Sequence, residues 1–159
     1  MKAATITELK KELKHRSHEQ LLDYCLKMSR FKLETKELLT YLVFESENEQ
    51  AYVESVKAFI THEIGSIEYK KYYYIKKSIR RILRQTKRYI RYSKIKESEA
   101  EILIHFCSEV LKIKPSISKN KMLTNMYRKQ LEMAQKAILK LHDDLQFDFN
   151  STIDDLPRL

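Results

Sequence analysis

A single glycine in 159 residues is the feature that most constrains what this chain can fold into. About eleven glycines are expected at the usual frequency of ~7%, and only two prolines add to the strong chain breakers. A protein built from β-strands needs many tight turns, and glycine and proline are the residues that tight turns favour. The sequence therefore predicts an all-α fold of about seven helices, arranged as an irregular helical bundle or as stacked helical hairpins.

Four short motifs have the pattern of a capping box, in which a Ser or Thr and a Glu or Gln three residues later satisfy each other's backbone amides. They begin at Thr5, Ser17, Ser46 and Ser98. Apolar residues at three- and four-residue spacing follow each of them, so we expect a helix to start at each. Gly65 stands at the end of a periodic segment, where a left-handed residue would end the helix.

The apolar positions after Ser17 predict a buried helix face, made of Leu21, Leu22, Cys25, Leu26 and Met28. The last periodic segment keeps its spacing from residue 123 to residue 145, which indicates one long helix. The linker around Pro115 is too short to separate two domains. We therefore expect a single domain over residues 1–149, followed by a frayed or disordered tail over residues 150–159.

The basic residues of the chain are concentrated in one segment, residues 69–96. This segment contains twelve Lys or Arg residues and no Asp or Glu, whereas the whole chain has 31 basic and 22 acidic residues and a net charge of +9. Without the segment, 19 basic and 22 acidic residues remain, a net charge of −3. The positive charge is therefore a local feature of an otherwise mildly acidic chain.

The same segment predicts an amphipathic helix. One stripe of it is apolar or small, and it consists of Tyr72, Ile75, Ile79, Ile82, Leu83, Thr86, Ile90 and Ser93. Lys and Arg fill the rest of the helix, with tyrosines among them. Basic groups follow phosphates and aromatic rings stack on bases, a combination that suits single-stranded nucleic acid. The candidate binding residues are Tyr73, Lys76, Lys77, Arg80, Arg81, Arg84, Lys87, Arg88, Arg91 and Tyr92, with Tyr69 and Tyr74 as further exposed rings.

Two alternatives to nucleic-acid binding stay open for the basic helix. The helix can present a solvated face, or it can pair with acidic neighbours such as Glu97, Glu99 and Glu101. It can also bind an acidic partner protein or pack within a homo-oligomer, which would make the chain an adaptor or scaffold. A nucleic-acid interface should leave Lys77, Arg81, Arg84 and Arg88 unpaired, whereas an adaptor should match them with carboxylates.

Motifs of enzymes and cofactor sites are missing from the sequence. It has no glycine-rich phosphate loop, no HExxH, no CxxC and no GxSxG. The pairs His15/His18 and His62/Glu63 lack further ligands nearby, and we expect no metal and no cofactor. The acidic residues at 142–148 fit a solvated helix end. We therefore expect a protein that is not an enzyme.

The two cysteines and the N-terminal segment indicate the compartment. Cys25 and Cys107 lie within apolar patterns, so we expect free, buried thiols. The first fourteen residues have no apolar region of a signal peptide, and no apolar run is long enough to span a membrane. The sequence therefore favours a cytoplasmic protein without a membrane partner.

Residues 6–64 resemble an uncharacterised family of small helical bacterial proteins, mainly from Bacteroidota. The likeness rests on the helix of Leu9 and Leu13, the cap from Ser17 to Leu22, the run from Lys36 to Leu42, and residues 49–57. What the resemblance implies is an all-α bacterial protein without an assigned activity. It transfers no catalytic residue to this chain.

Overall fold

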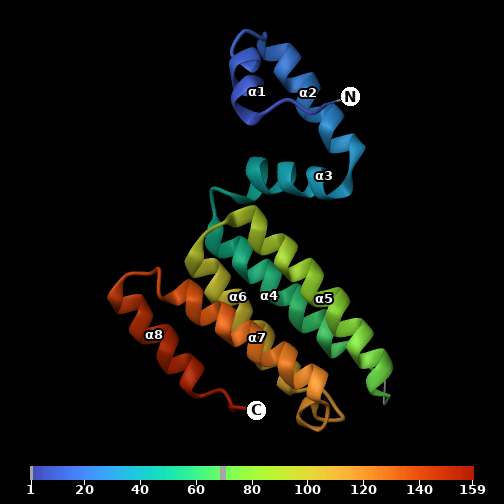
Figure 1. Ribbon diagram of the computed structural model, residues 1–159, viewed down its shortest axis with the longest axis vertical. Helices are drawn as coiled ribbons and strands as arrows, with labels where there is room; N and C mark the ends of the chain where they lie inside the picture. Colours follow the sequence, from blue (N-terminus) through green and yellow to red (C-terminus); the bar gives the residue numbers. More distant parts are fainter. Residues whose placement is uncertain (1, 69–70) are drawn as a thin grey trace. The chain divides into compact units, whose positions relative to one another are not determined.

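The computed structural model describes residues 2–68 and 71–159, and within them the chain is all-α, as predicted, with no β-strand (Figure 1). These residues form eight α-helices, one more than the seven expected. The helices are α1 (Ile6–Leu13), α2 (His18–Phe31), α3 (Leu33–Thr40), α4 (Glu49–Gly65), α5 (Tyr72–Ser93), α6 (Lys96–Leu111), α7 (Lys121–Ile138) and α8 (Asp143–Asp154). A π-helical turn spans Tyr41–Glu45 and a 3-10 turn spans Ile117–Lys119.

By its internal contacts the chain divides into two compact units, whereas the sequence suggested one domain over residues 1–149. The N-terminal unit is Met1–Phe44 and contains α1, α2 and α3. The C-terminal unit is Glu45–Leu159 and contains α4 to α8. The boundary falls inside the π-helical turn, so no glycine or proline marks it in the sequence.

The helices of the N-terminal unit have well-formed ends. The amide of Glu8 donates to Thr5 Oγ1 at 3.3 Å, and the amide of Thr5 donates to the Glu8 carboxylate at 2.7 Å. Ser17 and Gln20 form the same reciprocal pair at 3.2 and 3.1 Å. Both of these capping boxes are confirmed, since the residues that form them lie only three positions apart.

The N-terminal unit buries almost nothing. Among its described residues, 2–44, Tyr41 alone is buried. The expected buried face of α2 is therefore wrong, because its five members are half-buried or exposed: Leu21, Leu22, Cys25, Leu26 and Met28. Three short helices provide too few neighbours to cover an apolar stripe on all sides.

The core of the C-terminal unit forms around α6, which contacts α4, α5, α7 and α8. Nine of its sixteen residues are buried, and at 100° per residue they cover about 240° of the helix circumference. A helix buried on most of its sides belongs in the centre of a protein. Ile102, Leu103 and Phe106 are each at most 1% exposed, as are Ile60 of α4 and Tyr127 of α7.

Two of the expected helix starts differ from the structure. Asn48, and not Ser46, caps α4, since its side chain accepts from the amide of Ala51 at 3.1 Å. Helix α6 starts at Lys96, so Ser98 lies inside the helix and is buried. The Ser98 hydroxyl donates instead to the Glu49 carboxylate on α4. The hydroxyl that the local motif predicts as a helix cap therefore forms its hydrogen bond with a distant segment instead.

The single glycine does not have the backbone conformation that its position suggested. Gly65 is the last residue of α4, and no glycine has a positive φ. The left-handed conformation occurs at Lys94, with φ of 60°, directly after α5. Only Lys94 and Ile95 separate α5 from α6, so Lys94 makes the sharp turn between these two helices.

The long final helix predicted over residues 123–145 is two helices, α7 and α8. The chain turns between Ile138 and Asp143, and α8 packs against α6 and α7. The expected frayed tail is wrong for residues 150–154, which continue α8 and bury Ile153. Beyond α8, the Tyr127 hydroxyl donates to the carbonyl of Pro157 at 2.9 Å.

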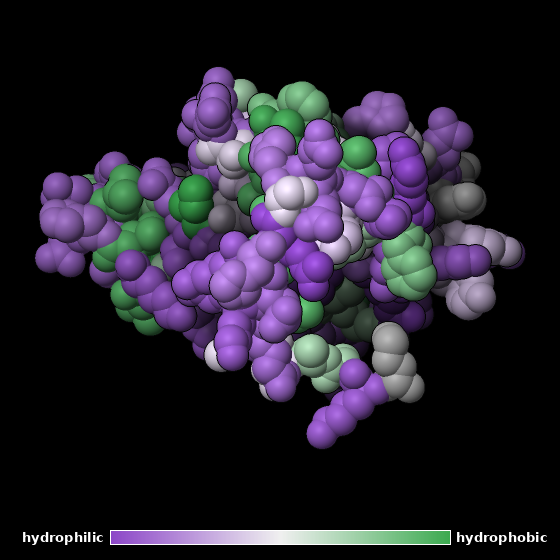
Figure 2. Space-filling view, turned by 90° about the horizontal axis from the view of Figure 1, so that it is seen from above, coloured by the Kyte–Doolittle hydropathy of each residue, from purple (hydrophilic) through white to green (hydrophobic). Residues whose placement is uncertain are grey.

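None of the helices within residues 2–68 and 71–159 combines the length and the apolar character that crossing a lipid bilayer requires. The face in Figure 2 is mostly hydrophilic, and hydrophobic residues show between the hydrophilic ones.

Candidate functional site

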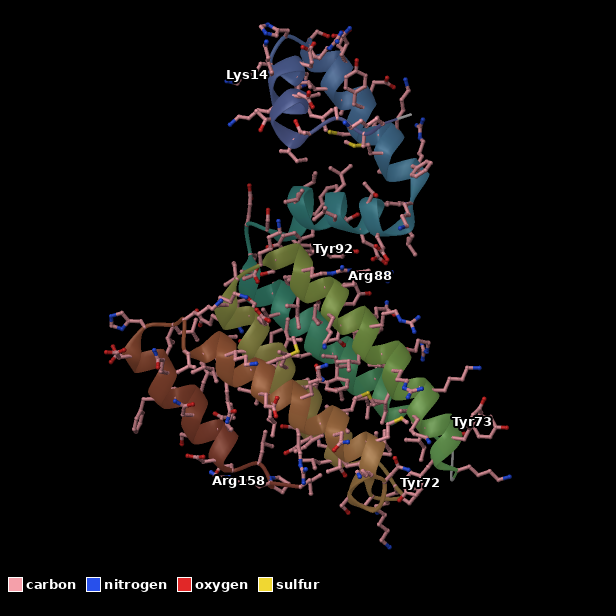
Figure 3. The ribbon with its side chains drawn as sticks, in the orientation of Figure 1. Lys14, Tyr72, Tyr73, Arg88, Tyr92 and Arg158 are labelled. Carbon is pink, nitrogen blue, oxygen red and sulfur yellow. The ribbon has the colours of Figure 1, made fainter. Side chains whose placement is uncertain are left out.

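Helix α5 presents the candidate binding surface because its apolar stripe fixes its orientation. Ile75, Ile79 and Ile82 are at most 1% exposed and anchor one side of the helix in the core. The opposite side therefore faces solvent. Figure 3 shows Tyr73 projecting near one end of α5, and Arg88 and Tyr92 near the other end. We call the exposed residues between positions 73 and 84 the outer face of α5: Tyr73, Tyr74, Lys77, Arg80, Arg81 and Arg84.

Two surface hollows lie along the outer face of α5. The first has a volume of 340 Å³ and is lined by Tyr73, Lys76, Lys77, Arg80, Arg84 and Met122. The second has a volume of 510 Å³ and is lined by Tyr74, Lys77, Ser78, Arg81 and Arg84. Lys77 and Arg84 line both hollows, and no carboxylate lines either one. Volumes of roughly 300–1,000 Å³ are typical of sites for small ligands or single groups of larger ones.

An aromatic pair stands beside the cations. The rings of Tyr73 and Tyr74 meet edge to face, with centroids 5.2 Å apart and an interplanar angle of 84°. Tyr73 is 68% exposed and Tyr74 is 46% exposed. Each ring lines one of the hollows, so an aromatic face accompanies the basic groups on both sides.

The basic residues of the outer face differ in their partners. Arg81 forms an ion pair with Glu63 of α4 at 2.6 Å, so its charge is already matched. Lys77 and Arg84 form no ion pair with any residue of the described chain. Arg80 donates to the sulfur of Met122 at 2.7 Å, a weak acceptor that leaves the positive charge uncompensated. Of the four residues that a nucleic-acid interface should leave unpaired, Lys77 and Arg84 form no ion pair in the described chain, whereas Arg81 and Arg88 have partners within the protein.

Three of the candidate residues do not belong to the exposed surface. Tyr92 is 9% exposed, and Arg88 is half-buried and engaged within the protein. Lys87 is half-buried with its Nζ 3.4 Å from the sulfur of Met133, and burial lowers the pKa of its ammonium group. Helical periodicity gives the angle of a residue around its own helix, but it does not give which of these angles other segments of the protein cover.

The remaining candidates keep their expected places. Arg91 is exposed and Lys76 is half-buried beside the first hollow, and neither forms an ion pair in the described chain. Tyr69 lies outside the described residues. The sequence missed Met122, which reaches the first hollow from α7, 42 residues away from Arg80. No pattern along the chain connects those two positions.

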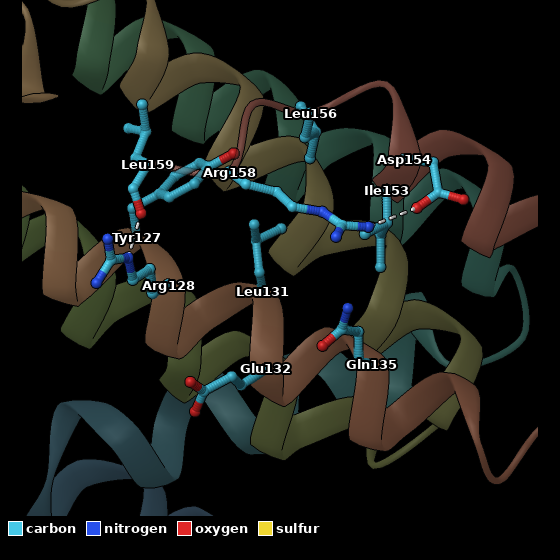
Figure 4. Close-up of a pocket in the computed structure, with 10 residues that line it drawn as sticks. All are labelled: Tyr127, Arg128, Leu131, Glu132, Gln135, Ile153, Asp154, Leu156, Arg158 and Leu159. Carbon is cyan, nitrogen blue, oxygen red and sulfur yellow. Dashed lines mark hydrogen bonds and ion pairs between the residues drawn. The ribbon is translucent and has the colours of Figure 1, made fainter.

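A third hollow lies between α7 and the C-terminal residues (Figure 4). It has a volume of 430 Å³, and its two arginines already have partners: Arg128 donates to the carbonyl of Leu159, and Arg158 lies 3.7 Å from Asp154. Burial raises the pKa of Tyr127 to about 12, so this phenol stays neutral. These contacts hold the C-terminal residues on α7, and Glu132 is the lining charge without an ion pair in the described chain, so the hollow offers no unmatched cation to an anionic ligand.

His105 stands in a polar cluster on α4 and α6. Its Nε2 lies 2.8 Å from the Thr61 hydroxyl and 3.2 Å from the carbonyl of Lys57, and burial lowers its pKa. Lys57 in turn contacts Glu54 at 2.7 Å and Glu101 at 2.9 Å. Each polar group has a neighbour within the protein, so the cluster joins α4 to α6. Within the described residues, no three His, Cys, Asp or Glu side chains gather in a way that could hold a metal ion.

Comparisons with protein-family models, with curated proteins and with solved structures return no match for this chain. The resemblance of residues 6–64 to a bacterial helical family therefore stays a prediction.

Proposed function

We propose that the chain binds single-stranded nucleic acid along the outer face of α5. The observation that carries this proposal is the position of Lys77 and Arg84, which line both hollows and form no ion pair in the described chain. A phosphate between them would meet two cations without displacing a carboxylate. The neighbouring Tyr73 and Tyr74 rings offer faces on which bases stack, an interaction worth about 1–3 kcal/mol per base.

The dimensions of the surface suit an extended strand. Residues 73–91 span about 27 Å at 1.5 Å per residue. Besides Lys87, whose ammonium group lies beside the sulfur of Met133, five cations on this length form no ion pair in the described chain: Lys76, Lys77, Arg80, Arg84 and Arg91. If about four phosphates are contacted, log affinity falls with log salt at a slope near −3, since each contact on a single strand contributes about −0.7.

An acidic partner protein is the other class of ligand that such a surface attracts. The ion pair of Arg81 with Glu63 shows that a carboxylate can bind a cation of this helix. A nucleic acid is favoured because tyrosine rings line both hollows next to the cations, and a carboxylate-bearing chain gains little from stacking faces. The binding experiment below separates the two classes.

The test measures fluorescence anisotropy of labelled single-stranded RNA and DNA, with poly-glutamate of equal charge as competitor. We expect salt-sensitive binding of the oligonucleotides and weak competition by poly-glutamate. The variant K77Q/R84Q should bind more weakly and flatten the salt slope by about 1.4 units, because two phosphate contacts are lost. The variant Y73A/Y74A should lower affinity at nearly constant slope, because stacking releases no counterions.

A matched control removes two positive charges elsewhere. Lys136 and Lys140 are exposed at the end of α7 and beyond it, and K136Q/K140Q lowers the net charge as much as K77Q/R84Q does. It should change affinity far less than the variant on α5. Equal losses in the two variants would show attraction to net charge alone. Absence of oligonucleotide binding in low-salt buffer, or equal binding of poly-glutamate, would refute the proposal.

A further inference from the structure

The N-terminal unit exposes more apolar surface than a stable soluble helix pair leaves uncovered. Eight apolar side chains of α1, α2 and the start of α3 are between 40% and 89% exposed: Ile6, Leu9, Leu13, Leu22, Leu26, Met28, Phe31 and Leu33. On α2 they do not all share one face: at 100° per residue Leu22 and Leu26 lie within about 40° of each other, whereas Phe31 lies about 180° from Leu22. Leu22 and Leu26 therefore form the apolar line of α2 that one partner can cover.

The charges of α2 are arranged in two halves. Its first half carries Glu19 and Asp23, and its second half carries Lys27 and Arg30. At 100° per residue these four side chains fall within about 80° of one another, on the flank beside Leu22 and Leu26. Helix α2 therefore has an apolar line with an acidic start and a basic end along the same side.

Such a helix is complementary to an antiparallel copy of itself. In that arrangement Leu22 lies opposite Leu26 of the copy, Glu19 opposite Arg30 and Asp23 opposite Lys27. A two-fold axis near residues 24–25 brings the same flank of each helix together, so each charge pair forms twice. The helix dipoles also oppose each other, which adds a small attraction.

Glu19 and Arg30 should contribute most of the electrostatic attraction between the two copies. Asp23 and Lys27 already form an exposed ion pair within α2 at 2.7 Å. Glu19 and Arg30 are exposed and form no ion pair with any residue of the described chain. Their available partners in this arrangement are each other, on two different copies.

We propose that the N-terminal unit is a dimerisation surface, in which α2 packs against α2 of a second copy in antiparallel orientation and the α1–α2 hairpins form a four-helix contact. A second copy is the occupant because the acidic and basic halves that match each other lie on the same helix. The proposal is independent of nucleic-acid binding, since it uses no residue of α5.

Sedimentation equilibrium of the full chain tests it first. We expect a species of twice 19.1 kDa whose population rises with concentration up to about 100 µM. The variant L22E/L26E should be monomeric with unchanged helix content by circular dichroism. The matched control L139E/F147E places the same charges on two exposed apolar residues of the C-terminal unit and should still dimerise; these residues are 72% and 77% exposed.

A charge exchange distinguishes specific pairing from loss of folding. E19R alone and R30E alone should each weaken the dimer about 10-fold, because like charges then meet twice. The double variant E19R/R30E should restore it. Three outcomes would overturn the proposal: a chain that stays monomeric at about 100 µM, a dimer that survives L22E/L26E, or a double variant that dimerises as weakly as the single ones. A monomeric chain would indicate that a different protein covers this surface.

Discussion

The N-terminal and C-terminal units contain helices of similar regularity, but they differ in what those helices bury. Helices α1 and α2 both begin with a complete capping box, and neither has a buried residue. Helices α5 and α6 have no side-chain cap at all, and they bury seven and nine residues. Caps define where a helix starts, whereas neighbouring helices supply most of its stability.

The largest difference between the two units should be in the labelling rates of their cysteine thiols. Cys107 is fully buried and burial raises its pKa to about 12, whereas Cys25 in α2 is half-buried. In dilute protein without denaturant we expect a thiol reagent to label Cys25 at least about 1,000-fold faster than Cys107, which reacts only when the C-terminal unit unfolds. Mass spectrometry of the labelled peptides gives both rates. Similar rates would mean that the two units are equally open.

Truncation of an apolar side chain should lower the free energy of unfolding by several kcal/mol more in the C-terminal unit than in the N-terminal unit. Phe106→Ala, in α6, should lower the free energy of unfolding by about 3–5 kcal/mol, because it leaves a cavity in the core. Leu22→Ala, at a position 54% exposed, should cost less than about 1 kcal/mol in dilute protein. Urea titrations followed by circular dichroism measure both values. A loss at Leu22 as large as that at Phe106 would show that α2 is covered in the monomer.

The N-caps offer a comparison of one kind of contact, a side chain that accepts from a backbone amide, in the two units. Asn120 caps α7 by accepting from the amide of Leu123 at 3.3 Å, and Ser17 caps α2 by accepting from the amide of Gln20 at 3.2 Å. Asn120→Ala should lower the global unfolding free energy by about 1 kcal/mol, the usual cost of a lost cap. Ser17→Ala should leave it unchanged and instead increase hydrogen exchange in α2. Global destabilisation by both would contradict independent units.

The smallest effect expected is a pH dependence of the unfolding free energy, and it arises from the C-terminal unit. Burial lowers the pKa of folded His105 below its ordinary value of 6.5, so the unfolded chain binds a proton more readily. Stability should therefore fall as the pH drops through 6.5 and level off below the folded pKa. His105→Gln should reduce this fall, while His15→Gln in the N-terminal unit should not. Unfolding titrations at about pH 7.5 and 5.5 compare the variants.

How far the sequence predicts the structure depends on the distance over which each contact acts. The capping boxes at Thr5 and Ser17 are confirmed because their hydrogen bonds span three residues. The motif at Ser98 was misleading because its hydroxyl bonds to Glu49, 49 residues away. The split between α7 and α8 was missed, since the apolar spacing continues through the turn that lets Ile153 reach the interior.

For the candidate site, too, the sequence predicts local features and not contacts between distant segments. The apolar stripe of α5 correctly predicts that Lys77 and Arg84 point to solvent, because the angle around one helix is a local property. The sequence could not show that Tyr92 is covered, that Arg81 pairs with Glu63, or that Met122 borders the first hollow. Each of these depends on a segment far away along the chain.

The two-residue connection of Lys94 and Ile95 determines where this protein tolerates changes in length. One residue inserted there would rotate α6 by about 100° about its axis. Ser98 would then turn away from Glu49, and the buried side chains of α6 would point at the wrong neighbours. The connection between α6 and α7 spans nine residues and can absorb an added residue without rotating either helix. We therefore expect natural relatives of this chain to vary in length after α6 and to keep a constant length between α5 and α6.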